Sequence, residues 1–397
     1  MDERFHTLAE LAVHGANVQP GQVVALGPTV GQEELARAIA EAAYKRGARF
    51  VDVAYFDPYV KRARIAYANE DTLDFVPPWY ANRLVTLGER GDARIGFAGI
   101  VAPDVLNGLD PARLGRDMLP WLKEASKVID DRSTNWTIVP CPHPAWAKLV
   151  YPGLDPDAAY EKLWQELWHV LRLDEPDPGA AWEQRMATLK TSAKNLTDCH
   201  FDRLEFKGPG TELAVGLLPT GRWLAADFET RNGLWHMPNI PTEEVFTTPD
   251  PTRTEGYVTS TKPLVLKDGA IVRGLKVRFE GGRAVEVEAE ENGVAMQSKV
   301  AYDDGSARLG EVALVDRHGR IGPLGTVFYD TLLDENAASH IALGNGFPFA
   351  VEAEDAERVN VSGIHIDFMI GSPEMVVTGV TASGERIPVL VGGDWQI

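Results

Sequence analysis

The chain has 397 residues, of which 44% are hydrophobic and 24% charged, a composition typical of a globular protein with two or three compact domains. Its 39 basic and 58 acidic side chains give a formal charge of −19, which argues against nucleic acid and anionic membranes as partners. Because no signal-peptide or membrane-spanning pattern occurs and two cysteines, Cys141 and Cys199, cannot build a disulfide framework, we expect a cytoplasmic location.

The first third of the chain alternates between helical and strand patterns. Apolar residues recur at helical spacing in residues 4–14, 33–46 and 79–90. Short apolar runs typical of strands occupy residues 23–27, 49–56 and 94–100. Strands separated by helices of this length predict a parallel sheet with crossover helices, so we expect an open α/β domain.

Residues 144–195 are predicted to form helices rich in tryptophan, with Trp146, Trp164, Trp168 and Trp182. Aromatic side chains on such helices belong more often to a core or a subunit contact than to a cofactor site. We therefore extend the first domain over residues 1–195.

After residue 198 the pattern changes to short strand-like runs separated by glycine and proline, as in residues 203–207, 212–217, 244–248 and 271–273. A hairpin is predicted around Gly281 and Gly282, and helices over residues 293–301 and 332–343. Closing strands are expected at residues 359–369, 375–381 and 387–391. Residues 196–397 therefore predict a second domain of the α+β class, mostly antiparallel.

Two of these strand patterns carry ionisable side chains. His365 and Asp367 flank Ile366, and residues two apart on a strand project from the same face. Neutral histidine and ionised aspartate are common metal ligands, although a hydrogen-bonded pair without a metal gives the same pattern. Glu243 and Glu244 are adjacent at the start of another strand, so one of them can face a pocket while the other faces away.

Weaker signals come from Glu335 and His340 in the helix-like segment, and from Glu311 before an apolar run. Each has an ordinary alternative, such as a hydrogen-bonded core histidine. Together they supply carboxylates and imidazoles without thiols, which suits zinc, cobalt, manganese or iron sites that are open to water and substrate. Patterns for serine hydrolases, phosphate loops, dinucleotide folds and HExxH zinc helices do not occur, so such a site must be dispersed along the chain.

Several motifs resemble those of the thermophilic aminopeptidase family. The resemblance covers essentially the whole chain and is carried by LAVHGANVQPGQVV, AYKRGARFVDV, PTEEVFTTP, STKPL, LGEVALV, DENAASHIALG and IHIDFMIGSP. It implies a metallo-aminopeptidase that removes N-terminal residues from peptides with two divalent ions, zinc, cobalt or manganese. It also implies a homodimer in which the N-terminal domain of each subunit helps to enclose the other's active site.

By motif, the resemblance implies six metal-binding side chains: Glu244, Glu311, Glu335, His340, His365 and Asp367. Two ions would lower the pKa of a bridging water, and the resulting hydroxide would attack the first peptide carbonyl. Glu311 is expected to bridge the ions, and Glu243 or Glu335 to carry the proton to the leaving amine.

One position departs from the family pattern. Phe347 stands where family members carry a tyrosine, and a phenyl ring cannot donate a hydrogen bond to a developing oxyanion. Tyr329 is then the candidate for that donor. Two alternatives stay open: a dihydroxypyridine-type ring-cleaving dioxygenase with a single Fe(II), whose C-terminal motifs are similar, and a relative that binds metal and peptide without efficient catalysis.

Overall fold

The computed structural model describes residues 2–117, 119–120, 123–225, 227–266 and 269–397. Backbone contacts divide the chain into two compact units, Met1–Trp182 with Asp227–Pro241 and Glu183–Ala226 with Thr242–Ile397. The boundary expected near residue 195 falls inside helix α9 (Pro178–Asp198), whose larger part belongs to the second unit. The return of residues 227–241 to the first unit has no counterpart in the local sequence patterns.

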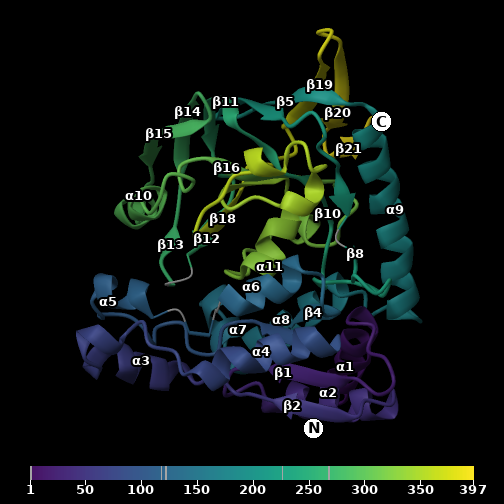
Figure 1. Ribbon diagram of the computed structural model, residues 1–397, viewed down its shortest axis with the longest axis vertical. Coiled ribbons are helices and arrows are strands. Elements are labelled where there is room, and N and C mark those ends of the chain that lie inside the picture. The colour runs from purple at the N-terminus through teal and green to yellow at the C-terminus, as the bar shows by residue number, and fades with distance from the viewer. Residues whose placement is uncertain (1, 118, 121–122, 226, 267–268) are drawn as a thin grey trace. The chain divides into compact units, whose positions relative to one another are not determined.

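A parallel sheet forms the centre of the first unit (Figure 1). Its strand order is β2-β1-β3-β4, with β1 (Val23–Gly27), β2 (Phe50–Val53), β3 (Ala93–Ala98) and β4 (Trp136–Pro140). The sheet is accompanied by α1 (Glu3–Gly15), α2 (Glu33–Lys45), α3 (Pro58–Tyr67), α4 (Pro78–Arg90), α5 (Pro111–Arg116), α6 (Lys123–Asp130), α7 (Pro144–Val150) and α8 (Pro156–Val170). The predicted parallel sheet with crossover helices is confirmed. A short ribbon of β8 (Phe228–Glu229) and β9 (Trp235–His236) completes the unit.

The core of the first unit contains most of the tryptophan side chains that the sequence analysis noted. Trp146, Trp164 and Trp182 are each 0% exposed, and the ring N–H of Trp182 donates to the carbonyl of Leu171 at 2.9 Å. Burial of such large rings is a major part of the stabilisation of a domain this size. These three rings therefore belong to the core, the first of the two alternatives that the sequence left for them.

The second unit contains two antiparallel sheets. One has the order β18-β17-β16-β10-β7, with β7 (Leu224–Ala225), β10 (Glu244–Thr247), β16 (Leu309–Val315), β17 (His340–Gly344) and β18 (His365–Met369). The other has the order β15-β14-β11-β6-β5-β19-β20-β21. Its strands are β5 (Phe201–Gly208), β6 (Thr211–Leu217), β11 (Pro249–Thr259), β14 (Lys276–Glu280), β15 (Arg283–Glu288), β19 (Val376–Thr381), β20 (Arg386–Val391) and β21 (Asp394–Trp395).

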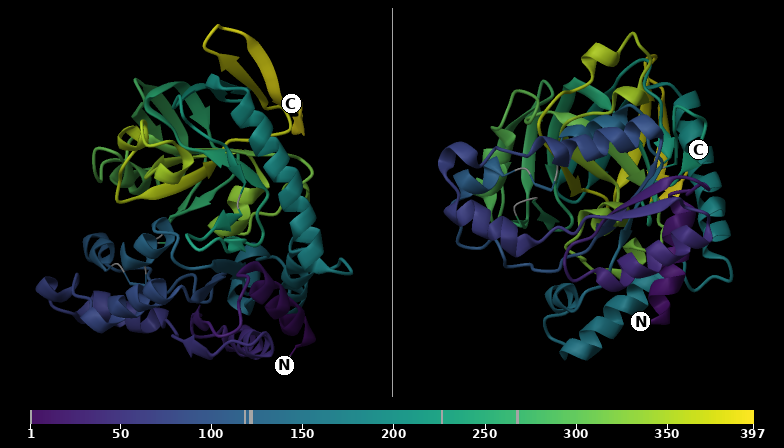
Figure 2. Two further views of the ribbon diagram at one scale, coloured as in Figure 1. Left: turned by 45° about the vertical axis from the view of Figure 1, so that its right-hand side comes forward. Right: turned by 60° about the horizontal axis from the view of Figure 1, so that its bottom comes forward.

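Smaller elements connect these sheets, and the second part of α9 lies beside them (Figure 2). They are β12 (Leu264–Val265), β13 (Ile271–Val272), α10 (Gly293–Val300) and α11 (Thr331–Asp334). The predicted hairpin at Gly281 and Gly282 is confirmed as the turn between β14 and β15. No helix in the described part of the chain is both long enough and apolar enough to cross a membrane.

One predicted element is wrong. Residues 332–343 do not form a helix, because α11 ends at Asp334 and His340–Gly344 form strand β17. Every residue of β17 is buried between its neighbours β16 and β18, so the strand shows no alternation of apolar and polar residues. A short apolar run of this kind has the same local pattern as a buried helix, and only pairing with distant strands decides between them.

Candidate metal centre

Five of the six predicted ligands lie on four adjacent strands of the five-stranded sheet, and the sixth, Glu335, begins a short 3-10 helix. Glu244 begins β10, Glu311 lies in β16, His340 begins β17, and His365 and Asp367 lie in β18. Each of these strands is hydrogen-bonded to the next in the order β18-β17-β16-β10. Residues far apart in the sequence are thereby brought to one face of one sheet.

The strand register also places small residues between these side chains. Ala342 of β17 is paired with Glu311 on one side and with Asp367 on the other. Residues that are directly opposite in a sheet project to the same face, so the methyl group of Ala342 lies between two carboxylates. Ala313, paired with His340, is the second small residue on this face. This face of the sheet therefore combines short alanines with long ionisable side chains.

The ligand atoms converge in two sets that share one residue. Glu244, Glu311 and His340 form the first set, Glu311, His365 and Asp367 the second, and within each set the atoms lie within 4.8 Å of one another. Nε2 of His340 is 3.1 Å from Oε2 of Glu244. Nε2 of His365 is 3.1 Å from both Oε2 of Glu311 and Oδ1 of Asp367. The two candidate sets thus have the carboxylate of Glu311 in common.

Backbone carbonyls orient both imidazoles. Nδ1 of His365 is 2.8 Å from the carbonyl oxygen of Asn345, and Nδ1 of His340 is 3.2 Å from that of Ala338. A carbonyl can only accept, so Nδ1 of each ring carries a proton and Nε2 is the ring nitrogen that faces the carboxylates. Nε2 is therefore the nitrogen that could bind an ion.

The charges of the cluster are unbalanced. Burial raises the pKa of Glu335 well above its ordinary value, and the nearby charges of Asp367 and Glu244 add to the effect. Burial also raises the pKa of Glu311. For His340 burial alone would lower the pKa, but the neighbouring carboxylates outweigh it and raise the pKa to about 10. The raised pKa values of the two glutamates and of His340 all mean that this cluster of side chains favours positive charge, which a divalent cation supplies.

One oxygen tests whether these residues suit a metal. Oε2 of Glu244 is buried and makes no hydrogen bond of regular geometry to any described residue, although Nε2 of His340 lies 3.1 Å away. A buried carboxylate oxygen without such a bond is costly unless a cation compensates it. Two atoms that bind the same ion lie this close to each other without a hydrogen bond between them. The donor set of carboxylates and neutral imidazoles therefore fits a divalent ion.

The remaining predicted residues lie as follows. The side chain of Glu243 does not belong to either ligand set. It is 0% exposed and accepts a hydrogen bond from Arg185. The hydroxyl of Tyr329 accepts a hydrogen bond from Arg273 at 3.1 Å. The backbone of Tyr329 has a positive φ of 56°. The ring of Phe347 packs against the imidazole of His365, with 5.4 Å between ring centroids.

Sequence reasoning missed Arg185 as a residue of this region. Its signal was available, because α9 carries Trp182, Arg185, Met186 and Leu189 at the spacing of one helical face, and all four are buried. A charged residue within an apolar stripe needs a buried partner of opposite charge. The identity of that partner could not be read from the sequence.

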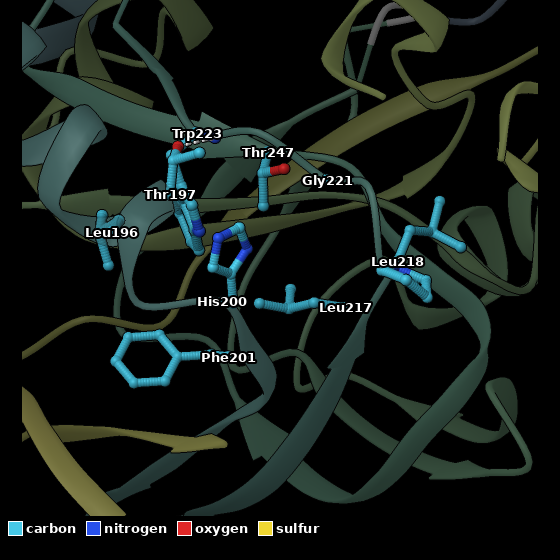
Figure 3. Close-up of a pocket in the computed structure, with 10 residues that line it drawn as sticks. Leu196, Thr197, His200, Phe201, Leu217, Leu218, Gly221, Trp223 and Thr247 are labelled. Atoms are coloured by element: carbon cyan, nitrogen blue, oxygen red, sulfur yellow. Dashed lines mark hydrogen bonds between the residues drawn. The ribbon is translucent and has the colours of Figure 1, made fainter. Parts of the chain in front are cut away.

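A separate hollow lies near the C-terminal end of α9 (Figure 3). Leu196, Thr197, His200, Trp223 and Thr247 are among the residues that line it. None of its lining residues is a candidate ligand, so the hollow is distinct from the candidate metal centre.

Residues 1–395 match the thermophilic metalloprotease family (M29). The chain belongs to this family. It is 40% identical to aminopeptidase T of Thermus aquaticus over 405 residues, which cover 100% of the chain and 99% of that relative. It is 35% identical to aminopeptidase PepS of Streptococcus thermophilus, covering 100% of the chain and 98% of that relative. The predicted family and the predicted enzyme class, a metal-dependent aminopeptidase, are thus confirmed.

Solved structures agree with this assignment to the metalloprotease family. The structure of AmpT from Thermus thermophilus has a TM-score of 0.92 and 40% identity, with 100% of this chain and 99% of that chain covered. The 2,5-dihydroxypyridine dioxygenase of Pseudomonas putida KT2440 has a TM-score of 0.55 and 12% identity, with 100% of this chain and 97% of that chain covered. At that identity the likeness shows a shared fold alone.

Proposed function

We propose that this metalloprotease removes the N-terminal residue from peptides at a centre of two divalent ions, zinc, cobalt or manganese. Glu244 and His340 would hold one ion, His365 and Asp367 the other, and Glu311 would bridge them. The observation that carries the proposal is the pair of ligand sets with Glu311 in common. Glu335 is included in the proposed centre because burial and the charges of residues in both sets shift the pKa of its carboxyl.

Two bound ions would supply an activated water nucleophile and would polarise the carbonyl of the first peptide bond. The protein's own residues would orient the peptide and exclude water. Of the five side chains in the two sets, His365 is the most exposed at 27%, whereas the others are at most 9% exposed. A peptide therefore reaches the centre from the side of His365, where Phe347 lies beside the imidazole.

Proton transfer is assigned to Glu335 in this proposal. The sequence leaves Glu243 and Glu335 as alternatives, and Arg185 already binds the carboxylate of Glu243. Burial raises the pKa of Glu335, so its carboxyl takes up a proton more readily than an exposed glutamate and would pass it to the leaving amine. The negative surroundings would also attract the ammonium group of a free N-terminus, which favours cleavage of the first peptide bond only.

We also propose that the chain is a homodimer and that segment 59–80 of the first unit forms the contact. The segment displays large apolar side chains to solvent: Tyr59 is 66% exposed, Tyr67 87%, Phe75 60% and Trp79 73%. Monomeric proteins rarely expose so many large rings within one segment. Aromatic side chains of this kind are enriched at subunit interfaces.

The proposed activity is tested by release of leucine from a Leu-initiated dipeptide. Metal-stripped protein is titrated separately with Zn²⁺, Co²⁺ and Mn²⁺, and bound metal is measured in the same samples. Activity that saturates near two ions per chain supports the dinuclear aminopeptidase. Stoichiometric binding without release would contradict it, and oxygen uptake with an aromatic diol would then test the dioxygenase alternative.

A further inference from the structure

A buried arginine holds two carboxylates beside the strands of the metal centre. Arg185 lies on α9 with its side chain 8% exposed. Its Nε donates to Oε2 of Glu243 at 2.5 Å. Its Nη1 and Nη2 donate to the two carboxylate oxygens of Asp316 at 3.1 Å each. Two parallel bonds to one carboxylate and a third to another fix a planar guanidinium in one orientation.

Both carboxylates are sequence neighbours of strands that carry candidate ligands. Glu243 directly precedes Glu244, the first residue of β10, and Asp316 directly follows Val315, the last residue of β16. Glu244 and Val315 are paired in the sheet. Arg185 therefore fastens β10 and β16 at the same end, one residue away from the ligand Glu244.

The segments that carry two further ligands are attached to the same place. The side-chain oxygen of Asn336 accepts the backbone N–H of Glu243 at 2.6 Å, and Asn336 directly follows Glu335. The hydroxyl of Ser339 accepts the backbone N–H of the last residue of β16 at 3.1 Å, and Ser339 directly precedes His340. The arginine is thus the centre of a buried polar layer that contacts the neighbours of the ligands.

A network of this kind is a costly way to stabilise a fold. The guanidinium and the two carboxylates of Glu243 and Asp316, which are 0% and 1% exposed, are all kept away from water. Buried ion pairs often contribute no more stability than apolar side chains of the same size. They do restrict the chain to one geometry, which is what a set of metal ligands requires.

We propose that Arg185 is a positioning residue for the metal centre, which fixes the ends of β10 and β16 so that Glu244 and Glu311 face the same ion. This inference rests on the proposed function, because it concerns the same centre. It gives Glu243 a role different from proton transfer. A lysine at position 185 would keep the charge but could not hold both carboxylates, since it lacks the planar fork.

The test measures the affinity of metal-stripped full-length protein for Zn²⁺ by competition with a chromophoric chelator. We expect Arg185→Lys to weaken Zn²⁺ binding about tenfold, as other residues that support metal ligands do. The matched control is Arg358→Lys. Arg358 also bridges two buried carboxylates of the second unit, Asp250 and Asp355, but neither is next to a ligand. We expect the control to bind Zn²⁺ like the unaltered protein.

A second variant, Glu243→Gln, keeps the test decisive if Arg185→Lys does not fold. It preserves the size of the side chain and an oxygen that accepts from Arg185 but removes the charge of Glu243, so the fold is expected to persist while the contact with Arg185 weakens. The proposal predicts weaker Zn²⁺ binding for this variant. Unchanged affinity with lost turnover would instead identify Glu243 as a proton carrier and overturn the proposal. If the unaltered protein binds Zn²⁺ but releases no leucine, the proposed function fails while the affinity comparison still decides the role of Arg185.

Discussion

At the scale of single residues, the proposed two-ion centre depends on one side chain that belongs to both ligand sets. Glu311 belongs to both ligand sets, and its strand is buried along its whole length. The position is therefore fixed by the sheet and not by a mobile loop. Its carboxylate offers two oxygens, of which Oε2 lies 3.1 Å from Nε2 of His365.

Glu311→Gln should leave the fold intact and lower kcat by about 10³-fold or more, because an amide offers one oxygen and no charge to the pair of ions. Release of leucine at saturating Co²⁺ measures the loss, and far-UV circular dichroism checks the fold. Near-normal turnover with two ions still bound would contradict the bridging role.

Phe347 concerns the other half of the chemistry, the charge that develops on the substrate oxygen. Its ring lies against His365 on the exposed side of the cluster, and it has no hydrogen-bond donor. We expect Phe347→Tyr to raise kcat about tenfold with little change in KM, because an added hydroxyl can donate to the oxyanion. Phe347→Leu is the matched control that keeps an apolar side chain. Equal kcat values for all three proteins would mean that position 347 supplies no donor and that Tyr329 deserves the next substitution.

At the scale of elements, strand β17 places a small residue between two ligand-bearing strands. Ala342 is 0% exposed and lies in register between Glu311 and Asp367. Any larger side chain here enters the space between two ligands.

Ala342→Val is therefore expected to weaken Zn²⁺ binding at least tenfold while it costs about 1–3 kcal/mol of stability through overpacking. Ile341→Val is the control, since Ile341 lies on the same strand but projects to the opposite face, and its cost is about 0.5–1.5 kcal/mol. Chelator competition and denaturant unfolding measure the two effects. Similar losses of Zn²⁺ affinity in both variants would mean that a small side chain at position 342 is not specifically required.

A second element, the ribbon strand β9, makes stability depend on pH. His236 is 5% exposed and packs near Trp136, with 6.1 Å between ring centroids. Burial lowers the pKa of His236 from 6.5 to about 4, so the folded chain holds this imidazole neutral. The unfolded chain takes up the proton first as pH falls.

The contribution of His236 is therefore complete above about pH 6.5 and is lost progressively toward pH 4, by up to about 3 kcal/mol. His236→Phe should flatten this part of the pH dependence. Urea unfolding between pH 4 and 7, followed by tryptophan fluorescence, compares the variant with the unaltered chain. Parallel curves for the two proteins would show that His236 is not the group responsible.

At the scale of the whole molecule, the formal charge of −19 and the exposed rings of segment 59–80 act in opposite directions on self-association. Net charge keeps copies apart, and burial of aromatic surface brings them together. Apolar burial gains more when several large rings are removed from water at once, and charge repulsion is screened by salt.

Trp79→Lys should raise the dissociation constant of the dimer at least tenfold, which dilution series in sedimentation velocity can measure. The control is Trp235→Lys, because Trp235 is 48% exposed in the same unit but outside the segment. A protein that is monomeric at all concentrations, or a dimer unaffected by the first variant, would refute the assignment of the contact.

The sequence alone determined what depends on local order and on motif. Strand periodicity put His365 and Asp367 on one face, helix and strand alternation predicted the parallel sheet, and the motifs identified the family. These features follow from spacing between near neighbours, which a sequence displays directly.

Tertiary structure decided which distant residues meet. It made His340 part of a strand, turned Glu244 toward the other ligands and Glu243 toward Arg185, and brought a helix residue 58 positions earlier in the chain to that carboxylate. A shift of one residue in strand register reverses the face of every side chain, and register is set by pairing across the sheet. The local sequence therefore presents both glutamates equally, and only the pairing of β10 with β16 distinguishes them.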